Sequence, residues 1–138
     1  MIEFHSENDF VLEDSAFAKA WIAKVITEEE KELGELQYIF CSDEQLHKIN
    51  LEFLKHDTYT DIISFDYTLG DVVSGDIYIS TDRVAENANE YKTGFKSELL
   101  RVMIHGILHY CGYKDKTVAE KAIMRAKEAY YLEKYPDE

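Results

Sequence analysis

Apolar and polar residues alternate along the chain with two periods, one typical of helices and one typical of strands. The first helical pattern starts at Asp14 or Ser15, either of which is a suitable N-cap, and predicts a helix through Leu33 that ends at Gly34. Its expected apolar face consists of Phe17, Trp21, Val25 and Ile26. The acidic run over residues 28–30 is expected to face solvent.

Four more helical patterns and four strand-like runs follow from the same reading. The helices are expected over residues 43–54, from Thr81 or Asp82 to a stop at Gly94, over 96–111 and over 117–135. In the first of these, the residues expected to be buried are Leu46, Ile49 and Phe53. Strands are expected over residues 1–5, 36–41, 61–67 and 72–80, with a hairpin turn at Gly70-Asp71. The sequence therefore predicts an α+β fold, a mixed four-stranded sheet packed with helices, in one domain over residues 1–138.

The helix over residues 96–111 carries the most informative chemistry. Between Leu99 and Tyr110 it is apolar except for one arginine, one glycine and two histidines, so it should be buried on most sides. His105 and His109 are four residues apart, which places both imidazoles on one face of the helix, one turn from each other. Buried imidazoles need partners for both ring nitrogens, and a shared metal ion would satisfy one nitrogen of each.

The residues that follow this helix can supply a third ligand. Gly112 allows the helix to end in a left-handed turn, after which the chain can double back and present the carboxylate of Asp115. We therefore expect His105, His109 and Asp115 to bind one metal ion at the end of a buried helix. Catalytic zinc sites use three protein ligands and leave a position for water or substrate. Zinc peptidases need a glutamate directly after the first histidine, where this chain has Gly106.

Several motifs occur in an order and spacing that resemble the YbeY family, over about residues 36–128. These are Asn50, the run Thr60-Asp61-Ile62-Ile63-Ser64-Phe65 (similar to the family's T-D-V-L-S-F), the strand-like run Gly75-Asp76-Ile77-Tyr78-Ile79-Ser80, a polar helix through Ala85, Glu86 and Ala88, then Glu98, and finally His105-Gly106-x-Leu108-His109-x-x-Gly112-Tyr113. The resemblance implies an α+β fold and a zinc-dependent endoribonuclease, specific for single-stranded RNA, in the bacterial cytoplasm. It also implies roles in rRNA maturation and ribosome quality control. Its partners would be rRNA and the ribosome or ribosomal proteins, with neither DNA nor a membrane.

Two positions depart from the family pattern. Asp115 stands where the family has a third histidine. A carboxylate is an acceptable zinc ligand, but its charge makes other, harder divalent ions more competitive. Leu54, followed by Lys55, stands where the family usually has an arginine. Lysine offers a point charge and not a planar fork, so Lys55 would replace that arginine imperfectly.

Composition limits where and how such an enzyme works. The chain has 15 basic and 28 acidic side chains and a formal charge of −13, whereas nucleic-acid binding normally depends on positive charge. We therefore expect weak, salt-sensitive RNA binding at a local patch, for which the candidates are Lys92, Lys96, Arg101, Lys114 and Lys116. The two cysteines, Cys41 and Cys111, are too few for a disulfide framework and are expected to be core thiols of a soluble protein in a reducing compartment, in keeping with the cytoplasmic location that the resemblance implies. No apolar run is long enough to span a membrane.

The remaining candidates are individually weaker. Besides metal-bound water, Lys55 and Arg101 are considered for catalysis, and Glu98 and Arg101 either orient a metal ligand or form an ordinary surface ion pair. By resemblance, Asp61 and Ser64 could line the cleft. The histidines without a partner at ligand spacing are expected at the surface or in loops: His5, His47 and His56. Of these, His56 is a candidate for the cleft rim, because it lies close to Thr60-Asp61.

Two alternatives to the endoribonuclease stay open. One is a non-catalytic ribosome-assembly factor with a structural metal, which the acidic composition and Leu54 make plausible. The other is an iron oxygenase, because two histidines and one carboxylate also describe the facial triad of such enzymes.

Overall fold

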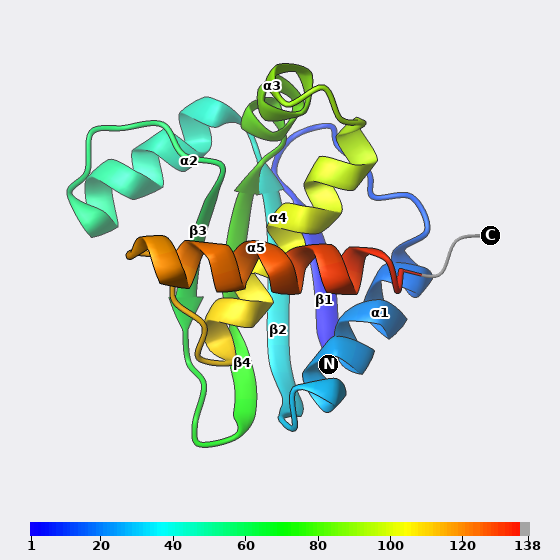
Figure 1. The fold of residues 1–138 in the computed structure, drawn as a ribbon. Helices are drawn as coiled ribbons and strands as arrows, with labels where there is room; N and C mark the ends of the chain where they lie inside the picture. Colours follow the sequence, from blue (N-terminus) through cyan, green and yellow to red (C-terminus); the bar gives the residue numbers. More distant parts are fainter. Residues whose placement is uncertain (136–138) are drawn as a thin grey trace.

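The strands form one mixed sheet in the computed structural model, which describes residues 1–135 (Figure 1). The strands are β1 (Ile2–Ser6), β2 (Glu32–Cys41), β3 (Ile62–Asp66) and β4 (Val72–Ser80), in the spatial order β1-β2-β4-β3. β1, β2 and β4 are parallel, and β3 pairs antiparallel with β4 as the expected hairpin. The α+β fold with a mixed four-stranded sheet is therefore confirmed.

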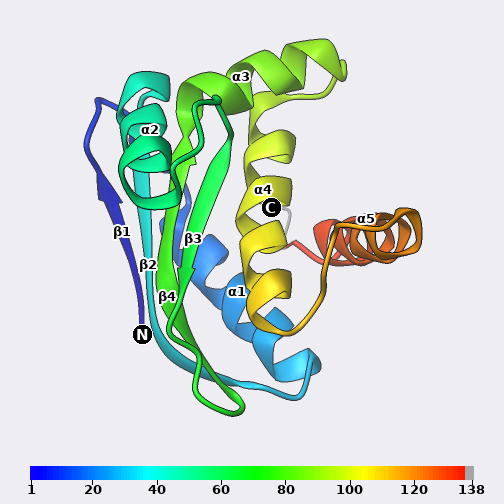
Figure 2. The same ribbon diagram turned by 90° about the vertical axis from the view of Figure 1, so that its left-hand side faces the viewer.

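Helices cover both faces of this sheet (Figure 2). α1 (Ser15–Glu28) and α4 (Phe95–Tyr110) pack on one face, and α2 (Asp43–Ile49), which continues into a short π-helix (Asn50–Leu54), packs on the other. α3 (Thr81–Glu90) lies at one end of the sheet. α5 (Val118–Leu132) crosses the outer side of α4, so α4 is enclosed between the sheet and α5.

Two close approaches fix α4 against the sheet. A Cβ atom at Gly106 would lie 3.1 Å from Ile77 Cδ1, so this glycine lets the helix backbone come near β4. One turn later, the Tyr110 hydroxyl donates to the Phe65 carbonyl at 2.9 Å, over Gly75, where a Cβ would lie only 2.5 Å from that hydroxyl. These contacts therefore fix the distance between the sheet and the C-terminal part of α4, which carries both histidines.

Two helix ends differ from the prediction, for the same reason. α1 ends at Glu28 and not near Gly34, because Glu30 adopts a left-handed backbone (φ 62°) and the amide of Lys31 reaches back to the carbonyl of Ile26. Gly34 instead lies within β2. Likewise α3 is closed by Lys92 (φ 57°), and Gly94 is the N-cap of α4. Non-glycine residues in the left-handed region gave no signal in the sequence.

Three expectations about burial were wrong. The buried side of α1 is Ala18, Trp21, Ile22, Val25 and Ile26, which leaves Phe17 one position off this face and 42% exposed. Phe53 is 63% exposed, because the helix widens into the π-helix at Asn50 and no longer follows the 3.6-residue period. Glu29 is not solvated. Its carboxylate accepts hydrogen bonds from Tyr113, Lys127 and Tyr131.

Candidate metal centre

The end of α4 forms the turn that the sequence predicted. Gly112 has φ 108°, the Tyr113 amide donates to the Leu108 carbonyl at 3.0 Å, and the Gly112 amide donates to the His109 carbonyl at 3.0 Å. These are the two hydrogen bonds of a Schellman motif, which satisfies carbonyls that the helix would otherwise leave unpaired. The chain then reverses and brings Asp115 back beside the helix.

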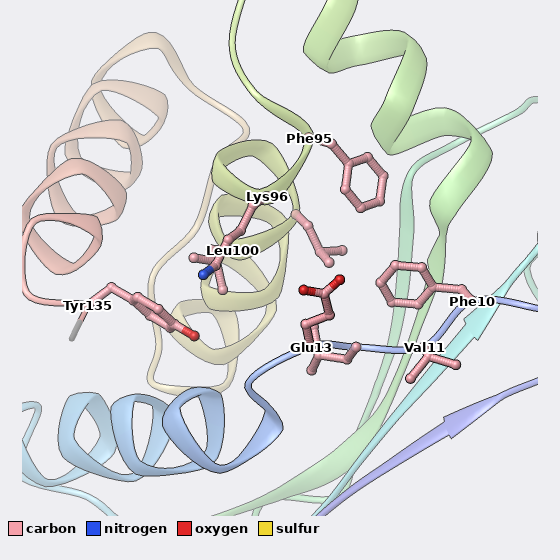
Figure 3. A pocket seen from close by; sticks show the side chains of 9 residues that line it. Phe10, Val11, Glu13, Phe95, Lys96, Leu100 and Tyr135 are labelled. Carbon is pink, nitrogen blue, oxygen red and sulfur yellow. The ribbon is translucent and has the colours of Figure 1, made fainter. Parts of the chain in front are cut away.

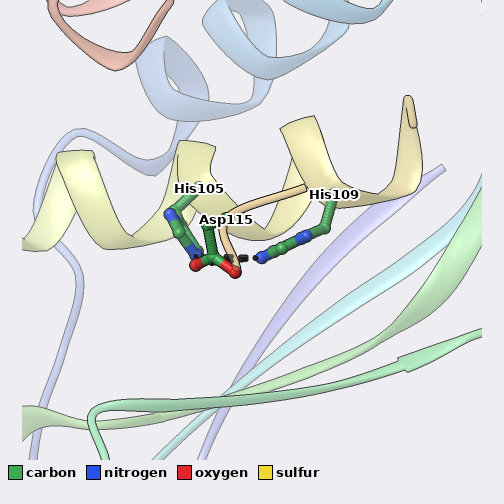
Figure 4. Close-up of side chains that lie close together, drawn as sticks. All are labelled: His105, His109 and Asp115. Atoms are coloured by element: carbon green, nitrogen blue, oxygen red, sulfur yellow. Dashed lines mark hydrogen bonds and ion pairs between the residues drawn. The ribbon is translucent and has the colours of Figure 1, made fainter. Parts of the chain in front are cut away.

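The three predicted side chains point toward one another (Figure 4). His105 Nε2 lies 3.1 Å from His109 Nε2 and 3.2 Å from Asp115 Oδ2, and His109 Nε2 lies 3.6 Å from the same carboxylate oxygen. Two atoms bound about 2.1 Å from a tetrahedral zinc ion lie about 3.4 Å apart, which falls within this range. The cluster could therefore hold a metal ion.

Hydrogen bonds behind each ring determine which nitrogen faces the cluster. His109 Nδ1 lies 3.0 Å from the Tyr113 carbonyl oxygen, and His105 Nδ1 lies 2.6 Å from Glu128 Oε2. Both partners accept, so we assign the proton of each neutral ring to Nδ1. The two Nε2 lone pairs then face each other and the Asp115 carboxylate. This is the arrangement of metal-ligating histidines, and a cation among the three atoms would remove their mutual repulsion.

Glu128 is the residue beside the candidate centre that sequence reasoning missed. Its side chain is 2% exposed, and besides His105 it accepts a hydrogen bond from Arg101 at 3.0 Å. Arg101 in turn donates to Glu98 at 2.6 Å. Burial raises the pKa of Glu128, but the hydrogen bonds from His105 and Arg101 outweigh it and hold that pKa below its ordinary value. Glu128 is thus ionised at neutral pH and fixes the His105 ring.

A signal for Glu128 does exist in the sequence. The buried residues of α5 are Met124, Glu128 and Tyr131, so a carboxylate occupies the apolar stripe of an amphipathic helix. Such a residue needs a buried partner. Glu98 and Arg101 do not form a surface pair: they belong to a buried chain of ion pairs that leads through Glu128 to His105.

Two small clefts adjoin His105. One is lined by residues of α4, α5 and the loop between them: Arg101, His105, Asp115, Lys121, Met124, Arg125 and Glu128. The other lies toward β3 and α3, and its lining includes Asp61, Asn87, Tyr91 and Arg125. Burial raises the pKa of Asp61, although the nearby Arg101 charge acts against this. Asp61 thus lies at the cleft as the resemblance implied, whereas Ser64 lies farther along β3, beside Tyr110.

Several other candidates lie elsewhere. Among residues 1–135, Lys55 lines neither of these clefts. It is exposed and ends the π-helix in a left-handed conformation. His5 is exposed and pairs with Glu3, while His47 is stacked on Tyr59 and pairs with Asp57.

The cysteines behave as expected of core thiols. Cys41 is buried and Cys111 packs against the core. Burial raises the pKa of Cys41 to about 12 and that of Cys111 to about 11, so both remain protonated thiols, which are poor metal ligands.

An apolar pocket at the other end of α4 is separate from the metal centre (Figure 3). Phe10, Phe95, Leu100 and Tyr135 surround it. Lys96 lies here, 3.5 Å from Asp14 and over the Tyr135 ring. Nine residues of helix separate it from His105, which is about 14 Å along the axis. Lys96 therefore lies at the opposite end of α4 from the His-His-Asp cluster, where it pairs with Asp14.

Comparison with known proteins agrees with this geometry. The family model described as endoribonuclease YbeY matches residues 2–136. The chain belongs to the YbeY endoribonuclease family. The endoribonuclease YbeY of Christiangramia forsetii is 62% identical over 92% of this chain and 89% of its own length, and that of Flavobacterium johnsoniae is 56% identical over 93% and 92%. The solution structure of TM1509 from Thermotoga maritima has a TM-score of 0.71 at 29% identity, covering 98% of this chain and 89% of that one.

Membership of the YbeY family places the chain among metal-dependent endoribonucleases, which are hydrolases of phosphodiester bonds. The His-His-Asp cluster provides residues that such chemistry requires. Within residues 1–135, none of the helices combines the length and the apolar character needed to cross a bilayer.

Proposed function

We propose that this YbeY protein is a zinc-dependent endoribonuclease that cleaves single-stranded RNA during rRNA maturation and ribosome quality control, with the ribosome or its proteins as partners. The observation that supports this most is the convergence of His105, His109 and Asp115, with both Nδ1 atoms already engaged behind the rings. Because one ligand is a carboxylate, manganese and other hard divalent ions are the closest competitors of zinc.

Each residue then has a defined role. His105, His109 and Asp115 would hold the ion, which lowers the pKa of a bound water to about 7 and polarises the phosphodiester. Glu128, held by Arg101, keeps the Nδ1 proton on His105 and orients its ring. The Tyr113 carbonyl does the same for His109. Arg101 is thus a positioning residue, because its guanidinium is engaged by Glu98 and Glu128.

A cleavage assay with and without chelator tests this function. We expect the purified protein to cut single-stranded RNA, and both a chelator and His109→Ala to abolish cleavage. His5→Ala changes an exposed histidine far from the cluster and should leave cleavage unchanged. Absence of chelator-sensitive cleavage by a folded, metal-containing protein would instead favour the assembly factor. Elemental analysis that finds iron, with iron-dependent oxygen uptake, would favour the oxygenase.

A further inference from the structure

We infer that Lys121 and Arg125, on the exposed side of α5, form a phosphate-binding track that holds the backbone of single-stranded RNA across the metal centre. The inference rests on the proposed function only in taking RNA as the ligand. Because the chain is acidic and RNA is an anion, binding requires a local positive surface.

The charge of the chain is unevenly distributed. Residues 114–127 contain five basic and two acidic side chains, a net charge of +3, so the rest of the chain carries −16. One of the two acidic residues, Asp115, belongs to the metal cluster. Lys127 is turned away from the cluster, toward Glu29. The positive segment that remains adjoins the metal centre.

The structure directs two of these cations into the clefts beside His105. Lys121 and Arg125 are four residues apart on α5 and therefore share one face. Both line the cleft that contains His105 and Asp115, and Arg125 also lines the cleft toward Asp61. A strand that passes from one cleft to the other would cross the metal centre with Arg125 at the junction.

Both side chains are available to a ligand. Within the described part of the chain, the Lys121 ammonium has no hydrogen-bond or ion-pair partner. Arg125 has a side chain that is 58% exposed, and its nearest carboxylate oxygen, on Glu128, is 3.6 Å away and already bonded to Arg101. Arg101 itself is only 16% exposed and bonded on both sides, so it cannot replace them. Of the lysines and arginines that line these two clefts, those free to contact phosphate therefore lie on α5.

Salt-dependent binding tests this track. Fluorescence anisotropy would follow the zinc-loaded protein binding to a labelled 2′-O-methyl oligo(A), a single-stranded RNA analogue chosen to resist cleavage. Each phosphate contact to a single strand contributes a slope of about −0.7 in log K against log salt. We expect Lys121→Ala/Arg125→Ala to weaken binding at low salt about tenfold or more and to flatten this slope by about 1.4. The conservative pair Lys121→Arg/Arg125→Lys should restore both.

A charge-matched control separates a track from overall charge. Lys24 and Lys48 are exposed on α1 and α2, so Lys24→Ala/Lys48→Ala removes the same charge away from the metal centre. If the α5 variant binds like this control, or if the wild-type protein does not bind the oligonucleotide at low salt, the track does not exist. If the wild-type protein cleaves RNA but the α5 variant binds the oligonucleotide as well as the control variant does, the phosphate track is rejected and the proposed nuclease function is not. If the α5 variant loses binding but the wild-type protein cleaves no RNA, the proposed nuclease function is rejected and the track is not.

Discussion

At the scale of single residues, the candidate metal centre depends on a carboxylate outside the three converging side chains. Glu128, on another helix, accepts a hydrogen bond from Nδ1 of His105 in the tautomer assigned above, and this contact orients the ring. Outer partners of metal ligands raise the basicity of the ligand and hold it in place. The affinity of the cluster should therefore respond to Glu128 as well as to the three converging side chains.

We expect Glu128→Gln to lower metal affinity about 10- to 100-fold, because the amide keeps the shape of the side chain but loses the charge that holds the His105 proton. Competition with a chromophoric chelator would measure the change. Glu133→Gln, at the exposed C-cap of the same helix, is the matched control. Equal affinities for the two variants would show that Glu128 does not orient His105.

The same scale shows why part of the centre could be predicted and part could not. His105, His109 and Asp115 lie within eleven residues, and helix geometry and one glycine are enough to bring them together. Glu128 is 23 residues from His105, and its role depends on where α5 crosses α4, which no local pattern specifies.

At the scale of elements, the packing of α4 on the sheet depends on glycines. Because they lack a side chain, the backbone or a side chain of α4 can come closer to the strands there. Gly75 is such a point, because a Cβ there would lie 2.4 Å from the Phe65 carbonyl and 2.5 Å from the Tyr110 hydroxyl. We expect Gly75→Ala to destabilise the protein by about 2 kcal/mol, through overpacking and displacement of Tyr110. Urea denaturation would measure this. Gly94→Ser, at an open N-cap, should be neutral or slightly stabilising, and a similar loss in both variants would contradict the packing argument.

Glu29 joins the end of α1 to α5 and to the loop before it, and it makes stability depend on pH. Burial raises the pKa of Glu29, but hydrogen bonds from Tyr131, Tyr113 and Lys127 outweigh it and hold the folded-state pKa below its ordinary value. A carboxyl with a lowered folded-state pKa stabilises the protein above its unfolded pKa and loses this contribution as pH falls through the folded value.

We therefore expect Glu29→Gln to melt at a lower temperature than wild type at neutral pH and to lose less stability on acidification. The two curves of melting temperature against pH should converge below the ordinary glutamate range. Glu30→Gln, at the exposed neighbouring position, should follow the wild-type curve. Parallel curves for Glu29→Gln and wild type would show that Glu29 does not carry this pH dependence.

The bounds of an element were predictable where a single hydrophobic period runs through it. They were less predictable where the backbone leaves regular helical geometry. The predicted range 96–111 and the observed α4 differ by one residue at each end, because a long apolar pattern defines that helix. The ends of α1 and α3 were missed because Glu30 and Lys92 adopt left-handed backbones without the glycine that normally marks them. Phe53 was misplaced by the π-helix, which sequence periodicity does not reveal.

At the scale of the whole molecule, a metal ion held by this cluster would join α4 to the loop that leads into α5, in addition to the ion pairs of Glu128 that already join the two helices. Two of the three candidate ligands lie on α4, the third lies in the loop that leads into α5, and Glu128 of α5 is hydrogen-bonded to the first. An ion bound by this set favours the folded protein over the unfolded chain. Stability should therefore rise with metal concentration, whatever the enzyme does to RNA.

At a free zinc concentration 100 times the dissociation constant, this linkage amounts to about 2.7 kcal/mol. For a domain of this size we expect a rise of roughly 10 °C in melting temperature over the chelator-treated protein. Scanning calorimetry at several zinc concentrations would measure it. His109→Ala and Asp115→Ala should each lose most of the rise, whereas His5→Ala should retain it, because His5 lies in β1 and pairs with Glu3. A rise of the same size in all three variants would mean that zinc binds elsewhere on this acidic protein, and the cluster at the end of α4 would then not be the metal centre.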